Sequence, residues 1–292
     1  MRNHTKVAGD KSETVTQLPR ACQDETLAVE FMERQRWGDK PICTRCGSEA
    51  VYQMTGRDGR RSARFLWRCK SCDTQYTVRI GTVLEDSRIP LRHWCYGFWA
   101  ACASKKGVSA LQIKRMTGLS YKSALFMMHR IRFAMADEWN APLQGTVEVD
   151  ETYVGGKPRF KGKAQMGKMG RGTDKPPVVA MVERGGSVRA AVVPKITGAN
   201  LKSLIRATVD RRARIITDDS NLYHGIGSEF EGGHETVNHS RREYARGDVH
   251  TNTVEGFFSL LKRGVIGVYH HVGKQHLGRY LHEFDSDTRH GS

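Results

Sequence analysis

The chain of 292 residues carries 47 Lys and Arg against 31 Asp and Glu, which gives a formal net charge of +16 (47 − 31). This length predicts about two domains, and a charge of this size predicts a polyanionic partner, most simply nucleic acid. No run of residues approaches the ~18 apolar positions of a membrane span, and the N-terminal segment lacks the apolar core of a signal peptide. We therefore expect a cytosolic protein with no membrane partner.

The N-terminal part of the chain changes character near residue 18. Residues 1–18 are polar without periodicity, which predicts a disordered tail. The segment from there to residue 37 contains AVEFMERQRW, and its pattern predicts a short lead-in helix.

Two C-x-x-C pairs follow, with 22 residues between them. The pairs are Cys43 with Cys46 and Cys69 with Cys72, among seven cysteines in all. In a reducing compartment this pattern favours metal binding over disulfides. Thiolate pairs on two hairpin turns converge on a tetrahedral Zn²⁺, and a closed shell of sulfurs is structural rather than catalytic. The sequence therefore predicts a zinc ribbon with one structural Zn²⁺.

The segment after the ribbon predicts a helix with an apolar stripe. Leu91, Trp94, Cys95, Phe98 and Cys102 recur at helical spacing. We interpret the two cysteines of this stripe as buried thiols that act as small hydrophobic residues.

Residues 107–135 predict a helix-turn-helix. Ser109 caps a short helix, Thr117-Gly118-Leu119 makes the turn, and Ser120 caps a longer basic helix. In this geometry the N-terminus of the second helix faces a major groove and basic residues around it contact phosphates. The expected groove contacts are Tyr121, Lys122 and Ser123, and the expected phosphate contacts are Lys114, Arg115, Arg130 and Arg132. The alternative is an ordinary helical hairpin.

The stretch VEVDETYVGGK, residues 147–157, alternates as a strand does. Val147 and Val149 share one face, and Glu148 and Asp150 share the other. A rigid strand that carries carboxylates indicates a site for a hard cation such as Mg²⁺, although a solvated edge gives the same pattern. The loop after it, residues 155–175, is basic and rich in glycine. Its lysines, among them Lys157, Lys161 and Lys163, either clamp a DNA backbone or belong to a solvated hairpin loop.

The remaining elements come in a characteristic order. PVVAMVER and SVRAAVVP predict two strands joined at Gly185-Gly186, and they precede a helix (GANLKSLIRATVD), a strand (ARIITDD), a strand with a basic turn (HETVNHSRREYAR) and a helix (HTNTVEGFFSLLKRGVIG). This order predicts a ribonuclease H-like domain with a mixed five-stranded sheet, in which the first and fourth strands bring carboxylates side by side. Asp150 and Asp218 are those carboxylates, with Asp219 as the alternative to Asp218.

The last of these helices offers a third acid. Glu255 and Lys262 are seven residues apart and share a helix face. Without the upstream aspartates, Glu255 would be read as a surface acid. With them it is the expected third ligand.

Several motifs together resemble a known family. They are CTRC…CKSC, GTVLEDSRIPLRHW, VEVDETYVGGK, TDDSNLY, HTNTVEGFFSLLKRG and VYHHVGKQHLGRYLHEFD. On these motifs the chain, from about residue 20 to residue 285, resembles bacterial insertion-sequence transposases of the DDE superfamily, and more narrowly the ISXO-type group with an N-terminal zinc ribbon.

The resemblance implies a set of site residues. Asp150, Asp218 and Glu255 would bind Mg²⁺ or Mn²⁺, with Asn252 as an alternative third residue. Lys262 would contact DNA, and we add its neighbour Arg263 as a DNA contact. Glu148 and Glu151 are left as supporting or surface acids.

The expected protein is an α+β multidomain transposase. Its expected domains are the tail (1–18), the lead-in helix and zinc ribbon (19–90), the helix-turn-helix domain (91–140) and the ribonuclease H-like domain (141–292). It would bind the terminal inverted repeats of an insertion sequence in double-stranded DNA, cleave there and transfer the strands to a target without a covalent enzyme intermediate. Because two ends must be processed together, we expect a homodimer or a larger synaptic complex, associated with the nucleoid.

Two other functions fit parts of the sequence. One is a stand-alone nuclease on the same fold, and the other is a non-catalytic DNA-binding regulator derived from a transposase. Relatives continue past EFD with an aromatic and basic helix, whereas this chain ends in SDTRHGS. We therefore expect an altered C-terminus, which leaves the activity of this copy open.

Overall fold

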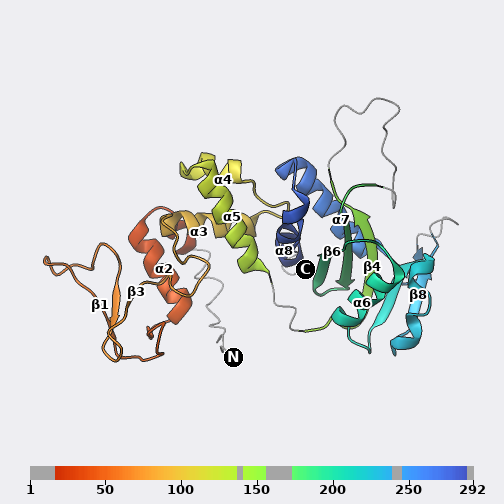
Figure 1. The fold of residues 1–292 in the computed structure, drawn as a ribbon, viewed down its shortest axis with the longest axis horizontal. Helices are drawn as coiled ribbons and strands as arrows, with labels where there is room; N and C mark the ends of the chain where they lie inside the picture. The colour runs from red at the N-terminus through yellow and green to blue at the C-terminus, as the bar shows by residue number, and fades with distance from the viewer. Residues whose placement is uncertain (1–16, 137–140, 156–172, 239–244, 288–292) are drawn as a thin grey trace. The chain divides into compact units, whose positions relative to one another are not determined.

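The computed structural model describes residues 17–136, 141–155, 173–238 and 245–287. It separates the chain into two compact units, Met1–Ala103 with Ala110–Ile131 and Ser104–Ser109 with Arg132–Ser292, here called unit 1 and unit 2 (Figure 1). Most of the predicted tail and three lysines of the predicted basic loop, Lys157, Lys161 and Lys163, lie outside the described residues. Within the described ranges, no helix combines the length and the hydropathy needed to span a membrane.

In unit 1, residues 17–21 are helical, and after a turn the predicted lead-in helix follows as α2 (Glu25–Trp37). Asp24 caps it by accepting a hydrogen bond from the N–H of Leu27 at 3.0 Å. A small antiparallel sheet follows, made of β1 (Val51–Gln53), β2 (Trp67–Cys69) and β3 (Gln75–Tyr76) in that order. Strand β1 lies in the β-prone run AVYQM, and β2 lies in the β-prone run ARFLWRC.

The helix is attached to this sheet by a buried acid. Glu33 on α2 accepts a hydrogen bond from Trp67 Nε1 at 2.7 Å and forms an ion pair with Arg61. The Trp37 ring meets the rings of Trp67 and Tyr76 edge-on, each with a centroid distance of 5.9 Å. The core of the ribbon is therefore small and packs against α2.

The predicted helix with the apolar stripe is α3 (Leu91–Ala103). Leu91, Trp94 and Cys95 are buried as expected, but Cys102 is exposed, so its prediction as a buried thiol was wrong. The reason is the packing of α5 (Tyr121–Met135) against α3 at Gly97, where an added Cβ would lie 2.7 Å from Ile131 Cδ1.

The two predicted DNA-binding helices are α4 (Ala110–Thr117) and α5, separated by a turn at Gly118. The predicted cap of α5 is confirmed, because Ser120 Oγ accepts the N–H of Ser123 at 3.1 Å. Arg132 was wrong as a phosphate contact. Its side chain is 1% exposed, and its Nε donates to Glu283 Oε2 at 2.8 Å.

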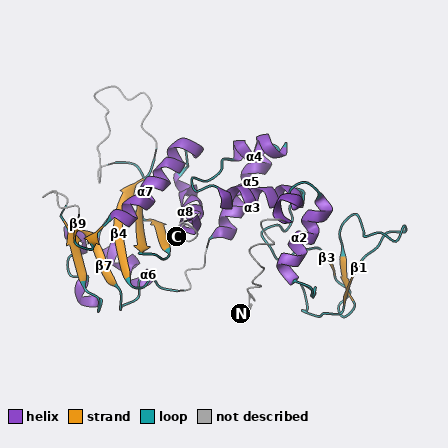
Figure 2. Cartoon of the chain, turned by 180° about the vertical axis from the view of Figure 1, so that it is seen from behind, coloured by secondary structure: helices purple, strands orange, loops and turns teal. Residues whose placement is uncertain are grey.

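Unit 2 contains the predicted mixed five-stranded sheet, in the order β6-β5-β4-β7-β8. Figure 2 shows its strands in orange, with β4 beside β7. The strands are β4 (Thr146–Tyr153), β5 (Pro177–Glu183), β6 (Val188–Val192), β7 (Arg214–Asp218) and β8 (His234–Val237). The first three strands along the chain pair antiparallel, whereas β7 runs parallel to both β4 and β8. A short hairpin of β9 (Ala245–Arg246) and β10 (Val249–His250), which the sequence did not predict as a separate element, follows β8.

Helices cover both faces of this sheet. Helix α6 (Gly198–Thr208) packs against the face that carries Val147 and Val149. Helices α7 (Asn252–Gly264) and α8 (Leu277–Asp287) pack against the other face. Because side chains alternate along a strand, Glu148 and Asp150 leave β4 on the side of α7.

Candidate active site and metal centres

Two aspartates lie at the carboxyl ends of neighbouring parallel strands. Glu148 on β4 is registered with Ile216 on β7, so Asp150 and Asp218, each two residues further on, leave the sheet side by side. Their carboxylates are oriented by backbone N–H groups. Asp150 Oδ1 accepts from Glu151 N at 2.7 Å, and Asp218 Oδ1 accepts from Ser220 N at 3.2 Å. Asp219, the alternative to Asp218, is exposed beyond the end of β7.

The third predicted acid lies on α7. The Thr251 hydroxyl donates to Glu255 Oε1 at 3.1 Å, which orients this carboxylate although the residue is exposed. Asn252 is the first residue of α7 and is exposed. Lys262 is exposed two helical turns beyond Glu255, and its Nζ lies 5.9 Å from the ring centroid of Phe258. Helix α7 therefore offers Glu255 and Lys262 to solvent together.

The acids of this cluster act on one another electrostatically. Burial raises the pKa of Asp150 to about 7, and the charges of Glu151, Asp218 and Glu255 raise it as well. The N–H of Glu151 acts in the opposite direction. The structure thus brings the three predicted acids into one cluster in which negative charge is crowded.

A fourth acid, Glu151, and a buried tyrosine, Tyr223, adjoin the acidic cluster. Tyr223, in the short 3₁₀ helix η3 (Asn221–Tyr223), is buried, and its hydroxyl donates to Glu151 Oε2 at 2.7 Å. Burial, together with Glu151, Asp150 and Asp218, raises the pKa of Tyr223 well above its usual value, so the phenol remains a donor. Sequence reasoning missed this residue, although Tyr223 belongs to the motif TDDSNLY.

Glu148 is not a surface acid. Its side chain is fully buried, and its carboxylate accepts hydrogen bonds from Arg184 and from the first turn of α7. The alternation in VEVDETYVGGK assigns Glu148 and Asp150 to one face. The structure separates them, because α7 begins over Glu148 and leaves Asp150 partly open.

The donor atoms of the acidic cluster fit a hard divalent cation. Carboxylate oxygens are the ligands that Mg²⁺ and Mn²⁺ take, and a cation would offset the burial and the neighbouring negative charges that raise the pKa of Asp150. The carboxylates are spaced more widely than the cysteine ligands. Among groups of three or more His, Cys, Asp or Glu side chains in the described ranges, the four cysteines form the group whose ligand atoms all lie within 4.8 Å of one another.

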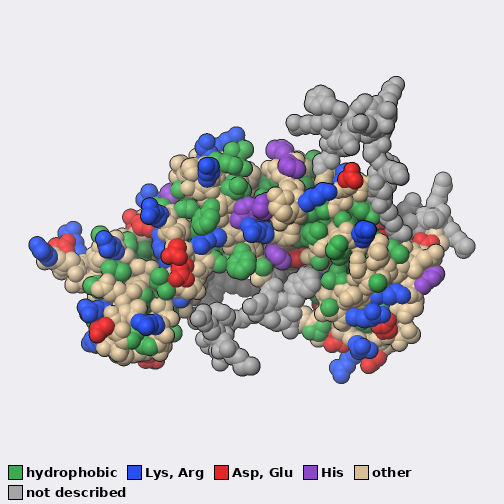
Figure 3. Space-filling view, in the orientation of Figure 1, with side chains coloured by type: hydrophobic (Ala, Val, Ile, Leu, Met, Phe, Trp, Pro, Cys, Tyr) green, Lys and Arg blue, Asp and Glu red, His purple; other side chains and the backbone are tan. Residues whose placement is uncertain are grey.

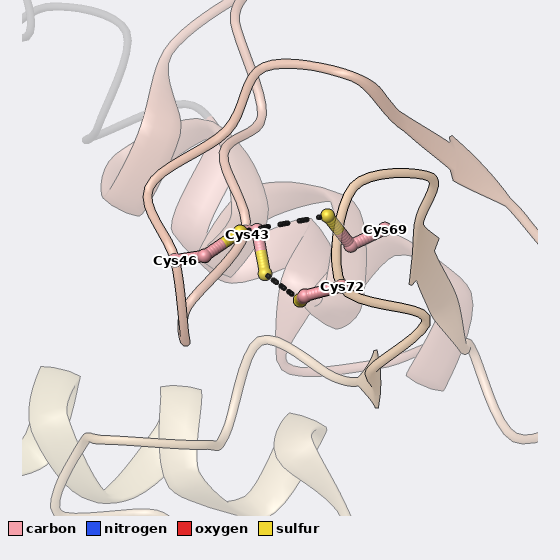
Figure 4. Close-up of side chains that lie close together, drawn as sticks. All are labelled: Cys43, Cys46, Cys69 and Cys72. Atoms are coloured by element: carbon pink, nitrogen blue, oxygen red, sulfur yellow. Dashed lines mark hydrogen bonds between the residues drawn. The ribbon is translucent and has the colours of Figure 1, made fainter.

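The four cysteine sulfurs converge from two turns of the ribbon (Figure 4). Sγ of Cys43 lies 3.6 Å from that of Cys72, and Sγ of Cys46 lies 3.7 Å from that of Cys69. A tetrahedral Zn²⁺ with bonds of about 2.3 Å requires sulfurs about 3.8 Å apart. The N–H of Ser71 donates to Cys69 Sγ at 3.3 Å, which favours the thiolate. The cluster therefore fits one structural Zn²⁺.

The predicted DNA contacts differ in how exposed their side chains are to solvent. Lys114, Arg115 and Lys122 are exposed, Tyr121 is 45% exposed, and Figure 3 shows basic side chains on the surface over α4. Ser123 is half-buried.

Two arginines of the predicted set make contacts within the protein. Arg130 donates to the backbone carbonyls of Val83 and Glu85, at 2.9 and 2.5 Å. Arg263 is exposed and donates to Ser259 O at 3.1 Å. Their roles toward DNA stay predictions.

Comparison with known proteins identifies both parts of the chain. Residues 142–285 match the ISXO2-like transposase domain, and residues 23–75 match the transposase zinc-ribbon domain. The first match contains Asp150, Asp218 and Glu255, and the second contains all four clustered cysteines. The zinc-ribbon match and the cysteine geometry together support the predicted structural zinc.

The chain is also similar to a protein of a transposable element. The chain is 29% identical over 272 residues to an uncharacterized protein in transposable element ISH50 of Halobacterium salinarum. The similarity covers 89% of each chain, and so extends beyond either domain alone.

Proposed function

Because this chain belongs to the family of ISXO2-like transposases with an N-terminal zinc ribbon, we propose that it cuts DNA at the ends of an insertion sequence and joins these ends to a target. The observation that carries the proposal is the convergence of Asp150, Asp218 and Glu255. The first two come from adjacent strand ends and the third from the helix packed on the same face of the sheet. The strand order and the mixed pairing of the sheet support a ribonuclease H-like domain.

In this proposal Asp150, Asp218 and Glu255 hold Mg²⁺ or Mn²⁺. When bound there, the metal stabilises the charge that develops on the attacking and leaving oxygens of a phosphodiester in an in-line displacement. The protein supplies the positioning. Thr251 orients Glu255, and the N–H groups of Glu151 and Ser220 orient the two aspartates. The exposed Lys262, on the same helix as Glu255, contacts a DNA phosphate.

The DNA-binding part of the proposal rests on unit 1. Helices α4 and α5 act as a helix-turn-helix, with Tyr121, Lys122 and Ser123 toward a major groove. Lys114 and Arg115 contact phosphates at its border. Together with the ribbon, these helices bind the terminal inverted repeats. Two ends are processed together, so the active form is a dimer or a larger assembly.

The test is a strand-transfer assay with oligonucleotides that carry the inverted repeats of the element. Asp150→Asn, Asp218→Asn and Glu255→Gln should abolish joining and leave repeat binding intact. Asp219→Asn tests the alternative second residue, because this exposed acid adjoins the site. Asn252→Ala tests the alternative third residue.

The same assay separates the rival functions. A stand-alone nuclease would cleave the oligonucleotides without joining them. A regulator would neither cleave nor bind Mn²⁺ at Asp150 and Asp218. Strand transfer by the Asp150→Asn protein would refute the metal-site assignment.

A further inference from the structure

Glu148 is a fully buried acid two residues before Asp150 on the same face of β4. Its carboxylate accepts four hydrogen bonds, from Arg184 Nε, Thr253 N, Thr253 Oγ1 and Val254 N, at 2.7 to 3.0 Å. A carboxylate whose oxygens are all used as acceptors in the interior is satisfied by the protein itself. Glu148 therefore has no oxygen left to bind substrate. Its carboxylate instead holds Arg184 and the first turn of α7 in place.

Three of these four bonds reach the first turn of α7. Thr253 and Val254 are the second and third residues of this helix, whose N–H groups an N-cap side chain normally satisfies. The N-cap residue here, Thr251, makes no side-chain cap hydrogen bond, and its hydroxyl donates to Glu255 instead. Glu148 thus acts as the cap of α7 from another element, and its negative charge lies at the positive end of the helix dipole.

Arg184 holds the opposite side of this carboxylate. Its Nε donates to Glu148 Oε1 at 2.7 Å, while its other nitrogens donate to Asp248 O at 2.7 Å and His250 O at 3.0 Å. The arginine therefore connects Glu148 to the strand that leads into α7. The segment that enters the helix and the first turn of the helix are both fixed to β4 through this one carboxylate.

We propose that Glu148 is a positioning residue that fixes the start of α7, and with it the Glu255 carboxylate, relative to Asp150. This inference rests on the proposed function, in which Asp150 and Glu255 hold the same metal. Glu255 directly follows Val254, and Asp150 is one pleat away from Glu148, so only short, rigid segments separate the two acids from the anchor. Loss of the anchor lets the first turn of α7 fray and moves Glu255.

The test compares Glu148→Gln with the unchanged full-length protein. A glutamine keeps the shape of the side chain but turns an NH₂ donor toward donors. In the metal-free protein, hydrogen exchange of the peptide that covers Thr253 and Val254 should become faster. Mn²⁺ affinity, titrated by electron paramagnetic resonance, should fall by about 10- to 100-fold. High Mn²⁺ concentration should restore strand transfer to Glu148→Gln, but not to Asp150→Asn.

Glu235→Gln is the matched control, since this acid on β8 of the same sheet is also paired with an arginine, Arg214. It should leave both readouts unchanged. If Glu148→Gln does not fold, Thr253→Val replaces it in the test, because this change at an exposed residue removes one donor to Glu148 and should lower the Mn²⁺ affinity. Thr253→Ser keeps the hydroxyl and should keep the wild-type Mn²⁺ affinity.

The two proposals fail in different ways. Wild-type exchange and wild-type Mn²⁺ affinity in folded Glu148→Gln would overturn the positioning role and leave the proposed function standing. Joining by Asp150→Asn would overturn the function. The exchange rates of α7 in the metal-free protein would still decide whether Glu148 anchors the helix.

Discussion

Glu148 and Asp150 leave the same face of strand β4, and their carboxylates meet opposite surroundings. Glu148 is surrounded by donors from Arg184 and α7, whereas Asp150 faces the charges of Glu151, Asp218 and Glu255. The negative charge of Glu148 is compensated by hydrogen-bond donors of the protein, whereas the carboxylate of Asp150 lies among other acids. Of the two, only Asp150 gains from a bound cation.

The burial of Asp150 beside other acids predicts a pH dependence of stability in the protein without added Mg²⁺ or Mn²⁺. The pKa of Asp150 is raised from 3.8 to about 7, so the folded protein keeps a proton that the unfolded chain loses between these values. Stability should therefore fall as pH rises from 4 to 7, by roughly 4 kcal/mol at most. Thermal melts in chelating-resin-treated buffer, which spares the zinc, measure this. Asp150→Asn should flatten the profile and be more stable than wild type at pH 8.

A metal titration completes this experiment. Mg²⁺ added at pH 8 should raise the melting temperature of the wild type and leave that of Asp150→Asn unchanged. An equal rise in both proteins would show that the cation binds elsewhere.

Loss of one cysteine ligand should unfold the ribbon. Its core contains four buried hydrophobic side chains, and two of them, Cys43 and Cys69, are in the metal cluster. Such a core is too small to hold its strands without the metal. We expect one zinc per wild-type chain by elemental analysis, almost none in Cys72→Ser, and faster hydrogen exchange in β2. Cys102→Ser, at an exposed cysteine outside the cluster, should keep zinc and protection. Retention of zinc by Cys72→Ser would contradict the site.

The buried pair of Arg132 and Glu283 should carry a large share of the stability of unit 2. The arginine is also stacked over the Tyr280 ring, 4.1 Å from its centroid. Arg132→Met takes the positive partner from the buried Glu283 carboxylate, to which the Tyr269 hydroxyl still donates at 2.6 Å, and should destabilise unit 2 by about 3–5 kcal/mol. The slowest-exchanging amides of β4 report this loss.

Two further variants show whether the pair itself is responsible. Replacing both partners, Arg132→Met with Glu283→Leu, should cost less than the single change. Breaking the exposed pair of Arg206 and Glu229 should change stability little. A single variant as mild as that exposed control would disprove the burial argument.

Charge removal in the last turn of α4 should weaken binding to DNA of any sequence. Lys114, a proposed phosphate contact, is exposed there, and Lys114→Ala should lower the slope of log affinity against log salt by about 1. Fluorescence anisotropy over a salt series measures this slope. Arg212→Ala is the control. It removes the same charge just before the start of β7, whereas Asp218 is at the end of this strand, and it should leave the slope unchanged.

The sequence by itself determined the features that depend on local spacing. Two C-x-x-C pairs predicted the ribbon because four thiolates close a zinc shell wherever two such turns meet. Period-two and helical patterns predicted the strands β4 to β7 and the helices α3 to α7, since a repeat along the chain is enough to assign a face. The order of these elements predicted the five-stranded mixed sheet and brought Asp150 and Asp218 to neighbouring strand ends.

Only the tertiary structure decided what covers each face. Arg132 looked like a phosphate contact until α8 brought Glu283 against it, and Cys102 looked buried until α5 packed at Gly97. Glu148 and Asp150 were equals in the alternation of β4, because periodicity names a face and is silent on the packing over it. The start of α7 covers one and leaves the other open, so the same residue type is an anchor at one position and a candidate metal ligand two residues later.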